Sequence, residues 1–194
     1  MKFVLFLIIS LLSFSSNVFT QTNSDDIREM LESRDNEIKE LLGPSGTDYT
    51  QEQRDQLKDI INDVIHYTSM AQFALGNTYD ELSEETREEF ISLFSTIIRD
   101  NSLNRLDIYR ADVIYNSIEV NGNIAQVETT AQLDNVRTPV DYKLERIDGT
   151  WMIIDMTIDD VSTAESYNRQ FQSIIRQRGF DALLESLRRR AARA

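Results

Sequence analysis

The spacing of apolar residues divides the chain into a helical first half, a strand-like middle and a helical end. Apolar residues recur three and four positions apart over residues 24–42, 50–76 and 83–107, and this spacing predicts amphipathic helices. From Tyr109 to Ile158 apolar and polar residues alternate instead, which predicts about four antiparallel strands. Helical spacing returns after Ser162. Helices, then strands, then helices indicate a single α+β domain.

Local signals predict where the first helices begin and end. Gly43-Pro44 ends the first helix, and Gly76-Asn77 is a plausible stop after the second helical stretch. Thr50 and Gln53 form a capping box at the start of that stretch. The third helix is expected to break near Asn101.

Turn and bulge signals divide the strand-like middle. The alternation slips by one residue near Ser117, which indicates a β-bulge. Asn121-Gly122 and Asp148-Gly149 are strong two-residue hairpin signals. The last strand, Trp151 to Ile158, carries Trp151 and Ile153 on one predicted face and Met152, Ile154, Met156 and Ile158 on the other. We therefore expect both faces of the sheet to be covered.

The C-terminal region reads as a capped helix followed by a shorter one. Ser162 and Glu165 form a capping box before a helix that carries Tyr167 and Phe171. Gly179 interrupts this helix, and a short amphipathic segment and an arginine-rich tail follow.

The first twenty residues have the features of a secretory signal peptide. Lys2 precedes an apolar run of about ten residues, which is shorter than the roughly 20 residues of a membrane-spanning helix. We expect residues 1–20 to be removed on export, residues 21–190 to form one domain and residues 191–194 to be a basic tail. Export would place the protein in the periplasm.

Charge and cysteine content exclude several classes of function. Residues 1–20 contain one charged residue, Lys2, so the mature chain has 19 basic and 33 acidic residues, a net charge of −14. This charge disfavours binding to nucleic acid, which requires basic residues against phosphates. The chain has no cysteine and one histidine, so thiol chemistry and multi-histidine metal sites are absent.

Two residues remain as candidates for chemistry. Asp155 is a carboxylate within an apolar strand, where burial raises a carboxyl pKa and favours a general base. The structural alternative is that Asp155 is partnered by an arginine or a tyrosine, or faces water. His66 follows an apolar stripe and is interpreted as a surface or helix-end histidine.

Several motifs resemble the MlaC (toluene-tolerance) family. Trp151 and Asp155, then Val161-Ser162, then Tyr167, Gln170 and Phe171 match the order and spacing of its C-terminal signature. Upstream, residues 70–76 (Met-Ala-Gln-Phe-Ala-Leu-Gly) and 86–90 (Thr-Arg-Glu-Glu-Phe) are similar to two further family segments, and Tyr142 fits a family strand. Three positions depart from the pattern: Asp160 replaces a glycine, Asn168 an arginine and Tyr79 a tryptophan. The first departure suggests a different turn before the following helix.

The resemblance implies a cystatin-like or ketosteroid-isomerase-like fold with a lipid cavity between a curved sheet and helices. It also implies a soluble periplasmic carrier of glycerophospholipids, with no cofactor except bound phospholipid. The implied partners are an inner-membrane ABC transporter complex and an outer-membrane lipoprotein complex, and the implied role is to maintain outer-membrane lipid asymmetry. The residues expected to contact lipid are Met70, Phe73, Phe90, Phe94, Ile97, Val127, Val140, Tyr142, Trp151, Ile153, Tyr167 and Phe171.

Two other functions remain open on the residues alone. One is a ketosteroid-isomerase-like enzyme that uses Asp155 in an apolar pocket. The other is an exported binding or adaptor module whose core is packed throughout.

Overall fold

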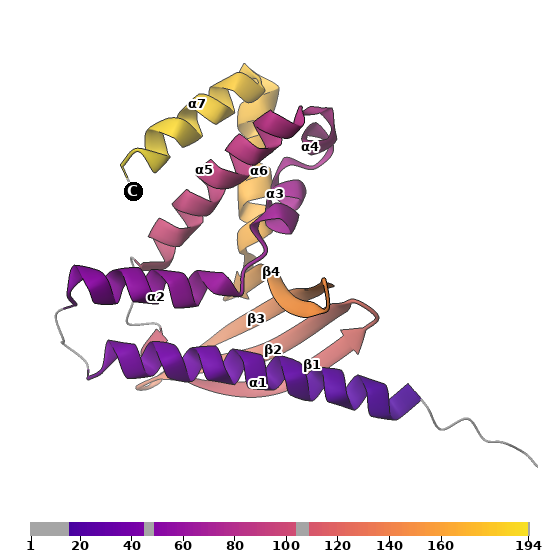
Figure 1. The fold of residues 1–194 in the computed structure, drawn as a ribbon, viewed down its shortest axis with the longest axis vertical. Coiled ribbons are helices and arrows are strands. Elements are labelled where there is room, and N and C mark those ends of the chain that lie inside the picture. The colour runs from indigo at the N-terminus through magenta and orange to yellow at the C-terminus, as the bar shows by residue number, and fades with distance from the viewer. Residues whose placement is uncertain (1–15, 45–48, 104–108, 194) are drawn as a thin grey trace, which may run out of the picture.

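The computed structural model of this chain describes residues 16–44, 49–103 and 109–193. In these residues the elements follow in the order α1 (Ser16–Leu42), α2 (Gln51–Asp63), α3 (Tyr67–Leu75), α4 (Asn77–Glu81), α5 (Glu84–Leu103), β1 (Asp112–Asn121), β2 (Ile124–Leu133), β3 (Val136–Ile147), β4 (Thr150–Ile158), β5 (Val161–Ser162), α6 (Thr163–Arg178) and α7 (Phe180–Ala191). This order confirms the predicted α+β class (Figure 1).

The predicted capping signals lie at helix ends. Thr50 Oγ1 accepts a hydrogen bond from Gln53 N at 3.2 Å, and Thr50 N donates to Gln53 Oε1 at 3.0 Å. Ser162 Oγ accepts from Glu165 N at 3.0 Å at the start of α6, and Gly179, with φ 84°, separates α6 from α7.

Three predictions about helix boundaries differ from the structure. The helical stretch predicted over residues 50–76 is divided into α2 and α3, because Ile65, between them, pairs with Ile153 of β4. The first helix was expected from residue 24, but α1 already begins at Ser16, within the segment expected to be a signal peptide. The expected break near Asn101 is wrong, because α5 continues through Asn101 to Leu103. Most of the predicted signal peptide, residues 1–15, and the predicted end of the third helix, residues 104–107, lie outside the described residues.

The sheet is antiparallel throughout, with the strand order β1-β2-β3-β4-β5. Its strands follow one another along the chain, as short turns between alternating segments require. The predicted bulge is present between Tyr115 and Ser117. The second hairpin turns at Asp148-Gly149 as predicted, whereas the first turns one residue later than predicted, since Asn121 pairs with Ile124.

A second bulge, in β4, was not predicted and changes which residues share a face. Lys143 pairs with Asp155 and Leu144 pairs with Ile153, so Ile154 has no opposite residue. The extra residue reverses the alternation. Met156 and Ile158 therefore lie on the same face as Ile153, and the prediction that placed them opposite Ile153 is wrong.

Helix α1 crosses one face of the sheet (Figure 1), which we call the inner face. Around the middle of α1, Ile27 and Leu31 pack with sheet residues into a buried cluster that includes Val127, Leu144 and Trp151. Toward its C-terminal end, α1 packs on α2 through a separate cluster of Ile38, Leu42, Leu57 and Ile61. The middle and the end of α1 thus have different main partners.

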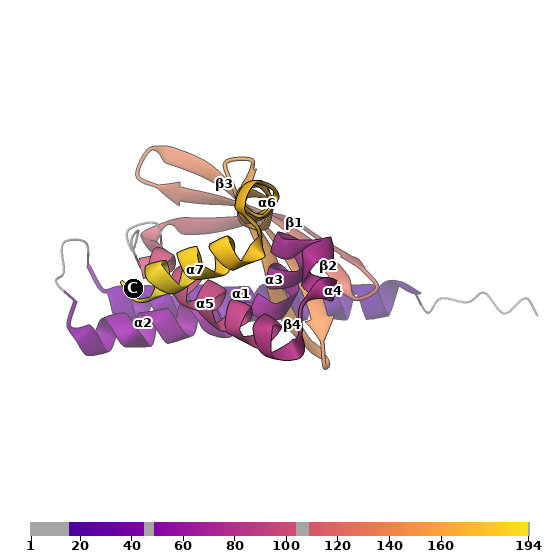
Figure 2. The same cartoon turned by 90° about the horizontal axis from the view of Figure 1, so that it is seen from above.

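Helices α3 to α7 form a layered body at one end of the sheet, as Figures 1 and 2 show. Its core is aromatic: the rings of Phe90 and Phe94 lie 5.7 Å apart, and Phe171 meets both edge-on at 5.7 and 5.5 Å. Edge-to-face pairs of this kind add about 0.5–1.5 kcal/mol each beyond the burial of their area. This body is therefore a self-contained core beside the sheet.

Hydrogen bonds join the helical body to the sheet. Ile153 N donates to Val64 O at 2.7 Å and Ile153 O accepts from His66 N at 2.9 Å, so the segment after α2 pairs with β4 like a short strand. His66 caps α3, as its Nδ1 accepts from Ser69 N, which confirms a helix-end histidine. These hydrogen bonds fix the end of α2 above the inner face of the sheet.

Among the described residues, no helix has the length and apolar character that crossing a membrane requires.

Candidate functional site

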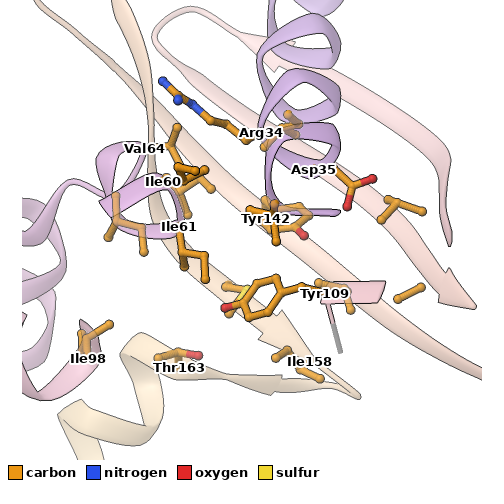
Figure 3. Close-up of a pocket in the computed structure, with 18 of the residues that line it drawn as sticks. Arg34, Asp35, Ile60, Ile61, Val64, Ile98, Tyr109, Tyr142, Ile158 and Thr163 are labelled. Atoms are coloured by element: carbon orange, nitrogen blue, oxygen red, sulfur yellow. The ribbon is translucent and has the colours of Figure 1, made fainter. Parts of the chain in front are cut away.

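A cavity of about 310 Å³ lies between α1, α2 and the inner face of the sheet (Figure 3). This volume is at the lower end of the range of about 300–1,000 Å³ that is typical of ligand pockets. The apolar residues that line it are Leu31, Ile38, Ile60, Ile61, Val64, Ile65, Met70, Ile98, Val113, Ala131, Val140, Ile153, Met156 and Ile158. Such a lining favours an apolar ligand.

The divided packing of α1 explains why this space is not filled. The middle of α1 packs on the sheet and its C-terminal end packs on α2, so neither cluster closes the region between them. On the sheet side of this region, the small side chain of Ala131, beside Val140, leaves space that a larger residue would fill. The β4 bulge then turns Met156 and Ile158 toward the same hollow.

Polar side chains border the cavity at its two ends. Arg34 and Asp35 of α1 lie at one end, and Figure 3 places Thr163, together with Ile98, at the end away from them. Asn101 and Tyr167 also line the cavity, and Asn101 Nδ2 donates to the Tyr167 hydroxyl at 3.1 Å. The lining is thus apolar in the middle and polar at the ends, which suits an amphiphile.

Three tyrosines on the sheet side have phenol groups held away from water. Burial raises the pKa of Tyr109 to about 12. Burial is also the main cause at Tyr115, where the pKa rises to about 12 and the carboxylates of Glu32 and Asp35 add to the effect. Burial likewise raises the pKa of Tyr142 far above its ordinary value. Charged forms are disfavoured at all three positions, as expected beside an apolar space.

Five of the twelve residues predicted to contact lipid line this cavity. Met70 and Tyr167 reach it from the helices, and Val140, Tyr142 and Ile153 reach it from the sheet. The structure brings these residues together from four elements, α3, α6, β3 and β4.

The other seven lie elsewhere. Phe90, Phe94, Ile97 and Phe171 are buried within the helical body, and Val127 and Trp151 are buried in the cluster with Ile27 and Leu31 of α1. Phe73 is 49% exposed and lines a second, more polar hollow on the opposite face of the sheet.

Sequence reasoning named no cavity residue of α1, α2 or β1, and from β2 it named Val127 in place of Ala131. The stripes of residues 24–42 and 57–65 were visible as helix faces, but a stripe that lines a cavity has the same spacing as one that packs against protein. Met156 and Ile158 were missed because the bulge was missed. No feature of the sequence singled out Ala131, whose small size helps to form the space.

Asp155 lies in the second hollow and not in the apolar cavity. One of its carboxylate oxygens accepts from Met156 N at 2.8 Å and from Ala164 N at 2.9 Å, and the other accepts from the Ser162 hydroxyl at 2.6 Å. These bonds hold the β4 bulge against the first turn of α6. The arrangement is that of a structural cap at a helix N-terminus. Asp155 is thus held structurally, but by a serine hydroxyl and two backbone amides and not by the arginine or tyrosine that we expected.

Comparison with known proteins places the chain in a family. The family model described as MlaC protein matches residues 23–189. This chain belongs to the MlaC family. Among solved structures, the chain is similar to a phospholipid-binding protein from Ralstonia solanacearum in complex with a phospholipid. The two chains are 20% identical, with a TM-score of 0.73 over 88% of this chain and 97% of that one, so they share the fold. No curated protein matches the chain.

The three departures from the MlaC pattern have structural explanations. Asp160 adopts φ 62°, a left-handed conformation that glycine also adopts readily, so the substitution itself does not require a different turn. The Asn168 amide donates to Phe73 O at 2.9 Å and to Ala74 O at 3.3 Å, and thereby caps the end of α3. Tyr79 is buried, with the Arg87 guanidinium 5.0 Å from its ring centre.

Proposed function

We propose that this protein is a non-enzymatic carrier that binds glycerophospholipid by its acyl chains in the cavity between α1, α2 and the sheet. The cavity itself is the observation that carries the proposal, since its middle is apolar and its ends are polar. Membership of the MlaC family and the phospholipid in the complex of the Ralstonia protein support it. The proposed contacts include Met70, Val140, Tyr142, Ile153 and Tyr167.

The energetics suit a carrier. Each methylene moved from water into the cavity contributes about 0.8 kcal/mol, so one long acyl chain gains on the order of 10 kcal/mol. The headgroup then needs only modest contacts. A lipid held in this way can cross an aqueous compartment and still be released to a membrane, where its chains are equally shielded from water.

Membership of the MlaC family and the composition of the N-terminal segment support a wider role. We propose that residues 1–20 direct export, that residues 21–190 act as one domain in the periplasm and that residues 191–194 form a basic tail. There the protein would shuttle lipid between an inner-membrane ABC transporter complex and an outer-membrane lipoprotein complex and so maintain outer-membrane lipid asymmetry.

Extraction of the purified protein with organic solvent, followed by mass spectrometry, tests the proposal. We expect recovery of phospholipid, and uptake of phospholipid from vesicles by the delipidated protein. Ala131→Trp, which fills the cavity, should abolish both, whereas Gln126→Trp, on the exposed outer face of the same strand, should leave both unchanged. A folded wild-type protein that yields no phospholipid and takes up none from vesicles would overturn the proposal.

A further inference from the structure

Two exposed valines follow two turns at the same end of the sheet. Val136 is 63% exposed and comes directly after the β2–β3 turn, and Val161 is 56% exposed and comes directly after the β4–β5 turn. Because alternate strands of an antiparallel sheet run in the same direction, the ends of β2 and β4 lie at one edge. The two valines are half of the four large apolar side chains that are exposed in the described part of the chain.

Both valines lie on the inner face, in line with the floor of the cavity. Directly opposed residues of antiparallel strands point to the same face, so Val136 shares a face with its partner Leu133, and Val161 shares one with its partner Ile158. Leu133 in turn lies two positions after Ala131, on the same side of β2. Ala131 and Ile158 both line the cavity. An apolar surface therefore runs from the cavity floor out to the two valines.

The cavity reaches solvent at this end. Figure 3 places Ile158 near Thr163, away from Arg34. Ile158, Thr163 and Met156 are only partly buried, and Asn101, which also lines the cavity, is exposed. An acyl chain that enters or leaves here passes along the apolar surface that ends at the valines.

The turns hold the valines out in water. Asp134, Asp159 and Asp160 have φ values of 53°, 50° and 62°, the left-handed conformations that close two-residue hairpins. Asp159 N also donates a hydrogen bond to Pro139 O at 3.0 Å, which ties the β4–β5 turn to β3. Turns fixed in this way keep the valines from folding back onto the protein, so only an outside apolar surface can cover them.

A lipid bilayer suits this edge better than a protein partner does. Valine is under-represented at the energetic centres of protein interfaces, and a side chain that projects from a turn needs a matching pocket in a rigid partner, whereas a bilayer surface deforms around it. Each acyl methylene exposed to water during transfer slows the step about fourfold. Apolar side chains that bridge the bilayer and the cavity shorten this exposed path.

We propose that Val136 and Val161 form a lip that contacts the surface of a lipid bilayer while an acyl chain moves between the bilayer and the cavity. The lip speeds transfer in both directions and leaves the affinity for bound lipid unchanged. This inference rests on the proposed function, because it requires lipid in the cavity.

The rate of lipid uptake tests the inference. Delipidated protein is mixed with phosphatidylcholine vesicles that contain self-quenched fluorescent phosphatidylcholine, and the rise in fluorescence is followed with time. These vesicles have no net charge, so the acidic chain is neither attracted nor repelled. Val136→Ser and Val161→Ser each remove a little over half of a valine side chain from the contact, so each should slow uptake about fivefold and the double variant about 25-fold. Val161→Leu should speed it. The amount of lipid bound at equilibrium should stay at the wild-type level in all of them.

Ile114→Ser is the matched control. Ile114 is 45% exposed on β1, and its neighbour Val113 lines the cavity, so Ile114 lies on the opposite, outer face of the sheet. This variant should take up lipid at the wild-type rate, and an equal slowing by Ile114→Ser and Val161→Ser would overturn the inference.

The remaining outcomes separate this inference from the proposed function. An unchanged rate for the double valine variant would overturn the inference alone, and that result is also expected if the valines dock a protein, because the vesicles contain none. A fall in equilibrium lipid content in step with the rate would assign the valines to the binding site and overturn it as well. Absence of uptake by the wild-type protein would overturn the proposed function and this inference with it.

Discussion

Enlarging the side chain at residue 131 should weaken lipid binding in steps that the structure sets. Ala131 is buried at 9% exposure on β2 and contributes a methyl group to the floor of the cavity. Valine adds two carbons there and leucine adds three, and each added carbon displaces about one lipid methylene. At about 0.8 kcal/mol per methylene, Ala131→Val should lose about 1.6 kcal/mol and Ala131→Leu about 2.4 kcal/mol of binding free energy. These losses correspond to about 15-fold and 60-fold in affinity.

The assay is the equilibrium partition of radiolabelled phospholipid between vesicles and protein, which are separated by flotation. Gln126→Val and Gln126→Leu are the matched controls, because Gln126 is exposed on the other face of the same strand. The free energy of unfolding of the lipid-free Ala131 variants should stay level or rise, since the added carbons fill space. Equal affinities for Ala131→Leu and Gln126→Leu would refute the reasoning.

Three further predictions concern stability. Asp155→Ala should lower the free energy of unfolding, measured in urea, by about 2–4 kcal/mol, because three donors lose a charged acceptor. The amount of lipid bound per folded molecule should not change. Loss of lipid from the folded variant would contradict a purely structural role. Asp160→Gly should raise stability by about 0.5–1 kcal/mol because it relieves a positive φ, whereas Asp181→Gly, in the first turn of α7, should lower it; the same sign for both would count against the explanation. Burial raises the pKa of Tyr109 from 10.0 to about 12, so as the pH rises the unfolded chain loses this proton first, and the free energy of unfolding should fall between pH 10 and pH 12. Tyr109→Phe should make that fall shallower when the free energy is measured by urea titration at each pH. An unchanged dependence on pH would argue against burial of the phenol.

The order of elements could be predicted from the sequence because each depends on nearby residues. The Thr50–Gln53 capping box, the Ser162 N-cap, Gly179 and the Asp148-Gly149 turn act within a few positions of themselves, and each lies at the expected boundary. The motifs that resemble the MlaC family also predicted the family that the comparison shows.

The cavity could not be located from the sequence, because it depends on how far apart packed elements lie. Phe94 and Phe171 lie on helix stripes like those of Ile61 and Leu31, yet the first two fill a core and the last two border a cavity. The β4 bulge is a further case. It arises where Ile153 pairs with the segment after α2, a contact between residues distant in sequence that no local pattern reports.

Photocrosslinking from inside the cavity tests the central claim most directly. A benzophenone amino acid is placed at Ile61, which lines the cavity, or at Gln126, on the outer face of the sheet, and each protein is illuminated with vesicles of radiolabelled phospholipid. The account predicts a lipid adduct from position 61 and none above background from position 126. Adducts of equal yield at the two positions, or an adduct from position 126 alone, would contradict it.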